Sequence, residues 1–359
     1  MSIVNFFREF DTHFINGIHK SLAFSYKIGK KLGFGPKIVF DDTLGDKNIP
    51  LLLKHLKNYQ WQQINEILQE ANDICRSFYI GYIADEDTTA KFRPDYFNAW
   101  VKAEPNNPFA HLTNGFNLIN WGWEARGSGV SSTVSSGMAE QFFLRLLAAQ
   151  QSFERVMQLD DSNPEPYIGM ITIEMGISYE QESLWENFVQ LKKRSLNHYN
   201  GHSAMLISLA EKWGGSSQAM FSLARNTSKQ VPPGSPLHAL IVEAHIEEWL
   251  HYSMIDDEET QQNYFFQKEV IQEIIESYNL CFPNNDPGVD PDTIEILNNY
   301  AFCLFQGKVE DGASELLTKL GRRGTSSPWC YMDEPFYNFL DSSYAYSYAF
   351  EKLGLIIPK

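Results

Sequence analysis

The sequence predicts an all-α protein in which antiparallel helical hairpins stack on one another. Apolar residues recur at three- and four-residue steps over most of the 359 residues, which is the period of one helix face. Short groups of Pro, Gly, Asn and Ser separate these periodic segments, and no strand-like alternating run interrupts them. Helices joined by such short loops must pack against their sequence neighbours, which gives antiparallel pairs.

Residues 3–24 form the first predicted element, an amphipathic helix followed by basic residues. We expect it to cap the helices that follow. Contact with an anionic membrane surface is the alternative, although Glu9 and Asp11 on the polar side weaken it.

A break at Gly33 and Pro36 separates this helix from the rest of the chain. We therefore predict an N-terminal helix and connector over residues 1–45 and a helical-repeat body over residues 46–359, with a sub-boundary near residues 230–236. The body is expected to consist of helices over residues 49–57, 59–80, 94–103, 108–126, 138–159, 164–176, 179–197, 201–212, 216–229, 236–253, 260–280, 291–306, 309–320 and 335–352.

Composition limits the classes of function. The chain is 43% hydrophobic and 14% aromatic, which is enough for a large core. Its formal charge of −16 argues against nucleic acid as a partner, because that affinity depends on Lys and Arg. The four cysteines form no CxxC pair and no apolar run approaches the length of a membrane span, so we expect a cytoplasmic protein.

The helix over residues 138–159 carries a repeat-like pattern. The spacing of Ala149, Phe153 and Val156 before an acidic turn is similar to the second helix of a tetratricopeptide repeat, with Val156 in place of Ala and Asp161 in place of Pro. Comparable turns occur at residues 103–108 and, loosely, at 281–287. These features predict a degenerate tetratricopeptide-like α-solenoid.

A wider resemblance covers residues 100 to about 225, which look like an uncharacterised bacterial domain family with a tetratricopeptide-like core. The matching features are Trp100, the helix end Trp121-Gly122-Trp123-Glu124-Ala125-Arg126-Gly127, the pair Ala149 and Phe153, and Lys212-Trp213-Gly214-Gly215-Ser216. The resemblance implies the fold and implies no activity.

Three residues near these helix ends are candidates for partner binding: Trp123, Arg126 and Trp213. Arg126 has the planar guanidinium that grips a carboxylate or phosphate. The alternative is structural, with Arg126 closing the last helical turn while the indoles pack between hairpins. The loop Gly214-Gly215-Ser216 after Trp213 has the same two interpretations: its backbone N–H groups bind an anion, or it ends one helix and starts the next.

An acidic run, Asp256-Asp257-Glu258-Glu259, lies between two predicted helices and is a further candidate surface for a basic partner. The alternative is a solvated loop. Residues 41–359 together carry a formal charge of −20, which attracts basic proteins at long range.

Catalytic and metal-binding patterns are missing from the sequence. His198 and His202 are four residues apart, but the glutamate of H-E-x-x-H is absent, and the glycine-rich loops lack the order of a phosphate-binding loop. We therefore predict no catalytic residues, no metal site and no cofactor.

These observations favour a non-catalytic protein-interaction module that binds a protein partner on a helical-repeat surface, and a bacterial immunity protein that neutralises a basic toxin is one form of it. The alternatives are a structural or membrane-docked assembly subunit and an enzyme with a dispersed pocket between helices.

Overall fold

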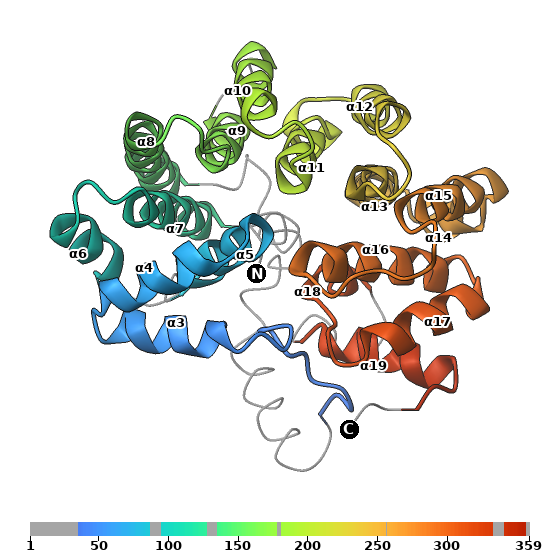
Figure 1. Ribbon diagram of the computed structural model, residues 1–359. Coiled ribbons are helices and arrows are strands. Elements are labelled where there is room, and N and C mark those ends of the chain that lie inside the picture. Colours follow the sequence, from blue (N-terminus) through green and yellow to red (C-terminus); the bar gives the residue numbers. More distant parts are fainter. Residues whose placement is uncertain are drawn as a thin grey trace. The chain divides into compact units, whose positions relative to one another are not determined.

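The computed structural model describes residues 35–86, 95–127, 135–177, 181–255, 257–332 and 341–356. Helices are the only regular secondary structure in these residues, which confirms the all-α prediction for the described part of the chain (Figure 1). Within the same ranges, every helix is too short or too polar to cross a membrane. The expected helix over residues 3–24 lies outside the described residues.

The described chain divides into two compact units. The first covers residues 46–216, and the second combines residues 35–45 with 217–356. The helices of the first unit are α3 (Asn48–Lys57), α4 (Trp61–Glu70), α5 (Asp73–Ala84), α6 (Tyr96–Ala103), α7 (Pro108–Arg126), α8 (Ser136–Leu159), α9 (Glu165–Ile177), α10 (Gln181–Arg194), α11 (Tyr199–Ser208) and the 3-10 helix η3 (Glu211–Trp213). The sub-boundary expected near residues 230–236 stays a prediction.

The helices of the second unit begin with α12 and include three short elements that connect longer ones. They are α12 (Ser217–Gln230), η4 (Pro236–Ala239), α13 (Leu240–Met254), α14 (Glu258–Asn263), η5 (Tyr264–Phe266), α15 (Lys268–Cys281), α16 (Pro291–Gln306), α17 (Glu310–Leu320), α18 (Ser326–Trp329) and α19 (Ser343–Lys352).

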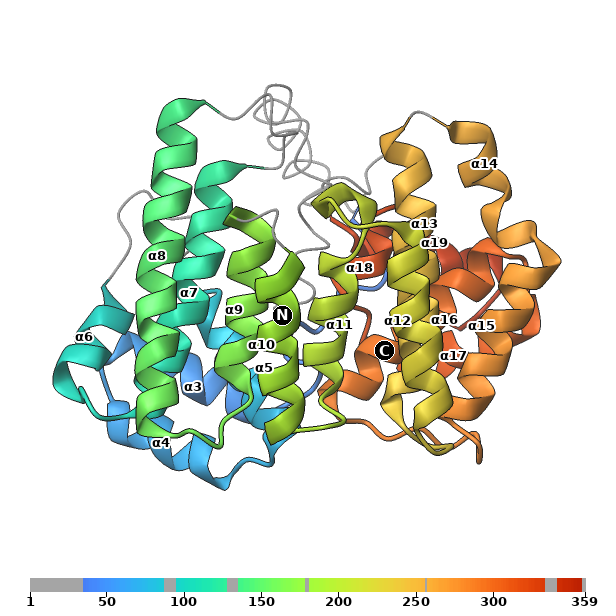
Figure 2. The ribbon, with the colours of Figure 1, turned by 90° about the horizontal axis from the view of Figure 1, so that it is seen from above.

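One phenylalanine ring fills the space between α7, α8 and α9 in the core of the first unit. In Figure 2, α7, α8, α9 and α10 lie side by side, and each packs on the next. Phe153 of α8 is fully buried, and its ring contacts Phe116 of α7 at 5.0 Å between centroids. A Cβ at Gly115 of α7 or Gly169 of α9 would lie 2.6 or 2.3 Å from the same ring. Glycine at both positions therefore leaves the space that the ring fills.

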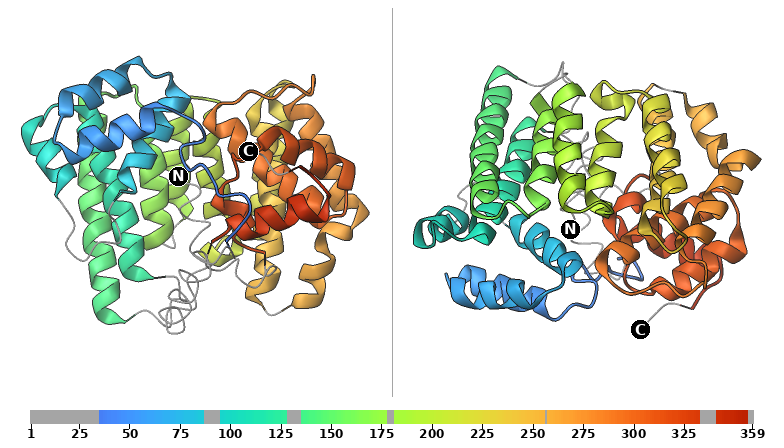
Figure 3. Two further views of the ribbon diagram at one scale, coloured as in Figure 1. Left: turned by 90° about the horizontal axis from the view of Figure 1, so that it is seen from below. Right: turned by 45° about the horizontal axis from the view of Figure 1, so that its top comes forward.

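Residues 35–45, which precede α3 in sequence, pack against α19 of the second unit. Residues 35–45 run beside α19, as the left view of Figure 3 shows. The backbone N–H of Ile38 donates to Ser347 Oγ at 2.9 Å, and Phe40 packs on Tyr346 with ring centroids 5.4 Å apart. Ile38 is 1% exposed, so this contact is part of the unit's core.

Several predicted helices are divided in the structure, among them the helix expected over residues 201–212, where extended backbone at Ala210 separates α11 from η3. The helix expected over residues 59–80 is interrupted at Ala71 and Asn72, where the backbone is extended and the Asn72 side chain accepts from the Cys75 N–H to start α5. The helix expected over residues 260–280 is divided by η5 and by extended backbone at Gln267. At each of these places a local turn or cap interrupts a helix that the apolar periodicity predicts as continuous.

Candidate functional site

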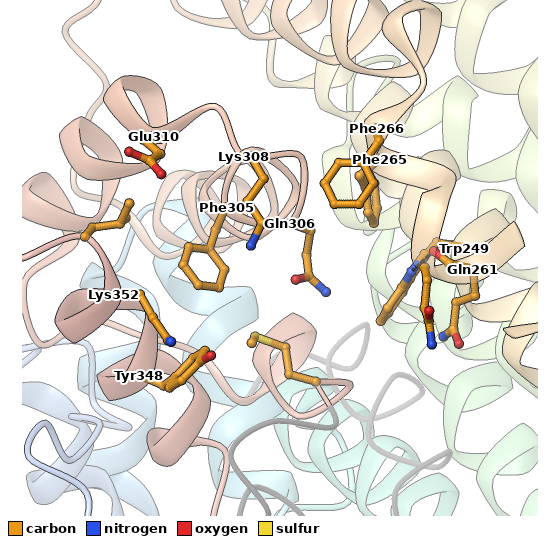
Figure 4. Close-up of a pocket in the computed structure, with 13 residues that line it drawn as sticks. Trp249, Gln261, Phe265, Phe266, Phe305, Gln306, Lys308, Glu310, Tyr348 and Lys352 are labelled. Carbon is orange, nitrogen blue, oxygen red and sulfur yellow. Dashed lines mark hydrogen bonds between the residues drawn. The ribbon is translucent and has the colours of Figure 1, made fainter. Parts of the chain in front are cut away.

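A cleft in the second unit is the candidate functional site. It has a volume of about 390 Å³, and α13, α14, η5, α16 and α19 contribute to its lining. Figure 4 shows Trp249 and Gln261 on one side and Lys308, Phe305, Tyr348 and Lys352 on the other, with Gln306 between them. The remaining lining residues are Gln262, Phe265, Phe266, Glu310, Met332 and Leu353.

The floor of the cleft is aromatic and rigid. Trp249 and Phe265 are 6% and 3% exposed, and each also packs on Phe302 in the core behind them. The Trp249 indole N–H donates to the backbone carbonyl of Gln261 at 3.1 Å, which ties α13 to α14. The floor is therefore fixed before any ligand arrives.

Two lysines lie at the edge of the cleft, each against an aromatic ring. Lys308 follows α16 in a turn with φ of 57°, and its Nζ lies 5.6 Å from the Phe305 ring centroid. Lys352, in the last turn of α19, has its Nζ 5.0 Å from the Tyr348 ring centroid. Within the described residues neither lysine forms an ion pair, so both ammonium groups are available to an anionic group of a ligand.

Three glutamine side chains add neutral donors and acceptors to the lining. Gln261 and Gln262 lie on α14 and Gln306 ends α16. Among the described residues their carboxamides have no hydrogen-bond partner. Each can therefore donate to and accept from a bound molecule without breaking an internal bond.

A hydrogen-bonded network joins α13 and η5, two elements that line the cleft, to α12 and α15. Arg225 of α12 donates two hydrogen bonds to Glu273 of α15, at 2.7 and 2.8 Å. His245 of α13 lies 3.1 Å from the same carboxylate through Nε2 and 2.8 Å from the Tyr264 hydroxyl through Nδ1. The hydrogen bonds from Arg225 and then His245 lower the pKa of Glu273 to about 2, while burial lowers the pKa of His245.

The predicted residues Trp123, Arg126 and Trp213 do come together, in the first unit. The indoles of Trp123 and Trp213 meet edge to face at 5.3 Å, and the Arg126 guanidinium lies 5.4 Å from the Trp123 ring. Arg126 also donates to the carbonyl of Gly127 at 3.2 Å, at the end of α7. Because Trp123 is fully buried, the geometry gives it a packing role, and partner binding at this cluster stays a prediction.

The acidic run lies at the start of α14. Asp256 is outside the described residues, and Asp257 caps the helix by accepting from the Thr260 N–H at 3.1 Å. Glu258 and Glu259 are exposed in the first turn, where negative charge is favoured by the helix dipole. These acids therefore have a local structural role at the start of α14, and partner binding by them stays a prediction.

The sequence did not point to the cleft residues. They come from elements between Trp249 and Leu353, and no short motif contains more than a few of them. One signal was available: the consecutive aromatics Tyr264, Phe265 and Phe266 cannot all face one core, and Phe266 is 53% exposed.

The lining of the cleft offers aromatic surface, carboxamides and two ammonium groups. In the described ranges no three His, Cys, Asp or Glu side chains gather as a metal site would require. Burial raises the pKa of the Cys281 thiol to about 12, which keeps that thiol in its unreactive neutral form. Comparison of the chain with family models, with curated proteins and with solved structures found no match.

Proposed function

We propose that the chain is a non-catalytic protein-interaction module, and that the cleft of the second unit is the centre of its binding surface. The observation that carries the proposal is the combination of a buried aromatic floor with carboxamides and lysines that have no hydrogen-bond or ion-pair partner within the described part of the chain. Protein interfaces concentrate their binding energy at buried aromatic positions surrounded by polar groups. The cleft offers this arrangement.

The scaffold we propose is a degenerate tetratricopeptide-like α-solenoid. Sequential packing of α7, α8, α9 and α10 supports it. So does the full burial of Ala149, Phe153 and Val156, the three positions that carry the repeat-like spacing. Stacked hairpins of this kind present extended surfaces suited to protein partners.

A bacterial immunity protein that neutralises a basic toxin is the narrower form of this proposal. The formal charge of −16 supports a basic partner, as does the exposure of Glu258 and Glu259. A membrane-docked or structural subunit and an enzyme with a dispersed pocket are the alternatives, and a cytoplasmic location stays a prediction from the sequence.

The test is affinity capture by the tagged full chain from the native host, followed by mass spectrometry. Phe266→Ala and Lys308→Gln change the cleft, whereas Phe143→Ala and Lys229→Gln remove a similarly exposed ring and a similarly exposed charge elsewhere. We expect one stoichiometric protein with wild type and both controls, and its loss with both cleft variants. Equal recovery by all five proteins would show that the cleft is not the binding surface.

A further inference from the structure

We propose that the cleft binds an extended peptide segment in which one carboxylate lies next to an aromatic side chain. The inference rests on the proposed function and specifies the partner's chemistry. It is built from three sets of groups in the lining: the carboxamides, the aromatic floor and the two lysines.

The carboxamides match a peptide backbone. Gln261, Gln262 and Gln306 each offer one acceptor oxygen and two donor hydrogens, and a peptide offers alternating C=O and N–H groups along an extended chain. A purely apolar ligand would leave these groups without partners where it displaces their water, which is costly, and a carboxylate alone would pair only with their N–H donors. The backbone of an extended segment satisfies them in pairs.

The aromatic floor fits a ring from the ligand. Trp249, Phe265 and Phe305 are each less than a tenth exposed, and Phe266, which is 53% exposed, stands beside them. Aromatic rings gain from edge-to-face and offset contacts in addition to the area they bury. The volume of about 390 Å³ lies near the lower end of the usual range for ligand sites, about 300–1,000 Å³, so it accommodates one large side chain with its flanking backbone.

The lysines select the charge. Figure 4 shows Lys308 and Lys352 on the same side of the cleft, with Phe305 and Tyr348 beside them. Glu310 also lines the cleft, and Figure 4 shows it farther from the centre than Lys308. Lys308, Lys352 and Glu310 together carry a formal charge of +1, which a single carboxylate of the ligand neutralises.

The rest of the chain limits the acidity of the segment. Residues 41–359 carry a formal charge of −20, so additional acidic residues in the ligand meet repulsion from the protein. The cleft is therefore suited to one carboxylate and not to a polyacidic stretch. That carboxylate can belong to an Asp or Glu side chain or to a chain terminus.

The test uses fluorescence polarisation of labelled eight-residue peptides with the full chain. The first pair, labelled at the N-terminus and amidated at the C-terminus, is Ser-Gly-Ser-Phe-Glu-Ser-Gly-Ser and its Phe-Gln counterpart. A third peptide replaces Phe with Ala, a fourth carries three consecutive Glu after Phe, and a fifth ends in Phe with a free terminal carboxylate and no Glu. The proteins are wild type, Lys308→Gln with Lys352→Gln, and the control Lys229→Gln.

We expect the Phe-Glu peptide to bind about three- to tenfold more tightly than the Phe-Gln peptide, as two partly exposed ion pairs allow. The double lysine variant should remove that preference, and Lys229→Gln should keep it. The fifth peptide tests whether a terminal carboxylate can replace the Glu side chain. If its binding depends on the two lysines, the inference holds with a chain terminus supplying the carboxylate.

Several results would overturn the inference. Equal binding of the Phe-Glu and Phe-Gln peptides, a preference that persists in the double lysine variant, tighter binding of the three-Glu peptide, or no loss on replacing Phe with Ala would each do so. If none of the peptides binds while Phe266-dependent capture of a host protein persists, the peptide inference fails and the proposed function stands. If the peptides bind as expected but no host protein is captured in a Phe266-dependent way, the peptide inference stands and the proposed function fails.

Discussion

The contact between Phe153 and two glycines gives the sharpest prediction about the fold. A Cβ at Gly169 would lie 2.3 Å from two atoms of the Phe153 ring, a distance that real side chains do not adopt. The ring is fully buried and cannot swing into solvent. Gly169→Ala should therefore destabilise the protein by about 1–3 kcal/mol through overpacking, although alanine favours a helix over glycine by roughly 0.5–1 kcal/mol.

The same substitution should reverse its effect once the ring is removed. Phe153→Ala alone should cost about 3–5 kcal/mol, because it deletes a buried ring and leaves a cavity. In that background the new methyl group of Gly169→Ala enters the cavity, so the second change should be neutral or stabilising by up to about 1 kcal/mol. The difference between the two effects, which is the coupling energy of the two sites, should be about 1–4 kcal/mol.

Urea unfolding of the full chain, followed by far-ultraviolet circular dichroism and tryptophan fluorescence, measures this cycle. Because two compact units can unfold in separate transitions, the two probes should be fitted independently. Gly137→Ala is the matched control, since nothing lies within 4 Å of a Cβ there. If Gly169→Ala costs the same in both backgrounds, the ring does not fill the space between α8 and α9 and the packing account is wrong.

Three further predictions concern pH, metal and charge. Burial lowers the pKa of His202 to about 4, so the folded protein favours the neutral imidazole. The stability that depends on this neutral form is fully present above pH about 6.5 and is lost as the pH falls toward 4. The loss amounts to about 3 kcal/mol at most. Denaturation from pH 7 to pH 4 should show that slope in wild type and a flatter one in His202→Gln, and parallel slopes would contradict the assignment. Treatment with a chelator should leave Tm unchanged within about 1 °C, and a shift of several degrees would reveal a structural metal. A variant with Asn at positions 256 and 257 and Gln at positions 258 and 259 removes the charge of the acidic run and keeps a capping side chain at position 257. This variant should associate more slowly with a basic partner at low salt. Stopped-flow association rates equal to those of wild type would show that the acidic run does not steer the partner.

Several helix boundaries could be predicted because the local signals are strong. The helix over residues 291–306 was predicted with the bounds found for α16, since Pro291 occupies the first turn and Gly307 follows the end. The division between α4 and α5 was missed because apolar residues continue at helical spacing through it. Only the side chain of Asn72, which caps α5, marks the new start.

For the cluster of Trp123, Arg126 and Trp213, residue type predicted which residues are distinctive but not whether they are buried. Their types and positions at helix ends were enough to single them out, and the structure does bring them together. Whether such a cluster is a core or a surface depends on what covers it. Here Phe142 covers Trp123, with ring centroids 4.8 Å apart, and no local pattern encodes that contact.

The cleft could not be predicted from the sequence for a related reason. Trp249 and Lys352 are about a hundred positions apart, and they line the same cleft only because α13 and α19 both belong to the second unit. Each residue is unremarkable in its own helix. The binding character arises from the combination of their side chains.

Hydrogen–deuterium exchange of the full chain with its purified partner tests the central claim most directly. The account predicts slower exchange on binding in the C-terminal half of α13, in α14 and η5, at the end of α16 and in α19, the elements that line the cleft. The backbones of α8 and α10 should exchange at the same rate in both states. Protection confined to α8 and α10, with the cleft elements unchanged, would contradict the claim that the partner binds at the cleft.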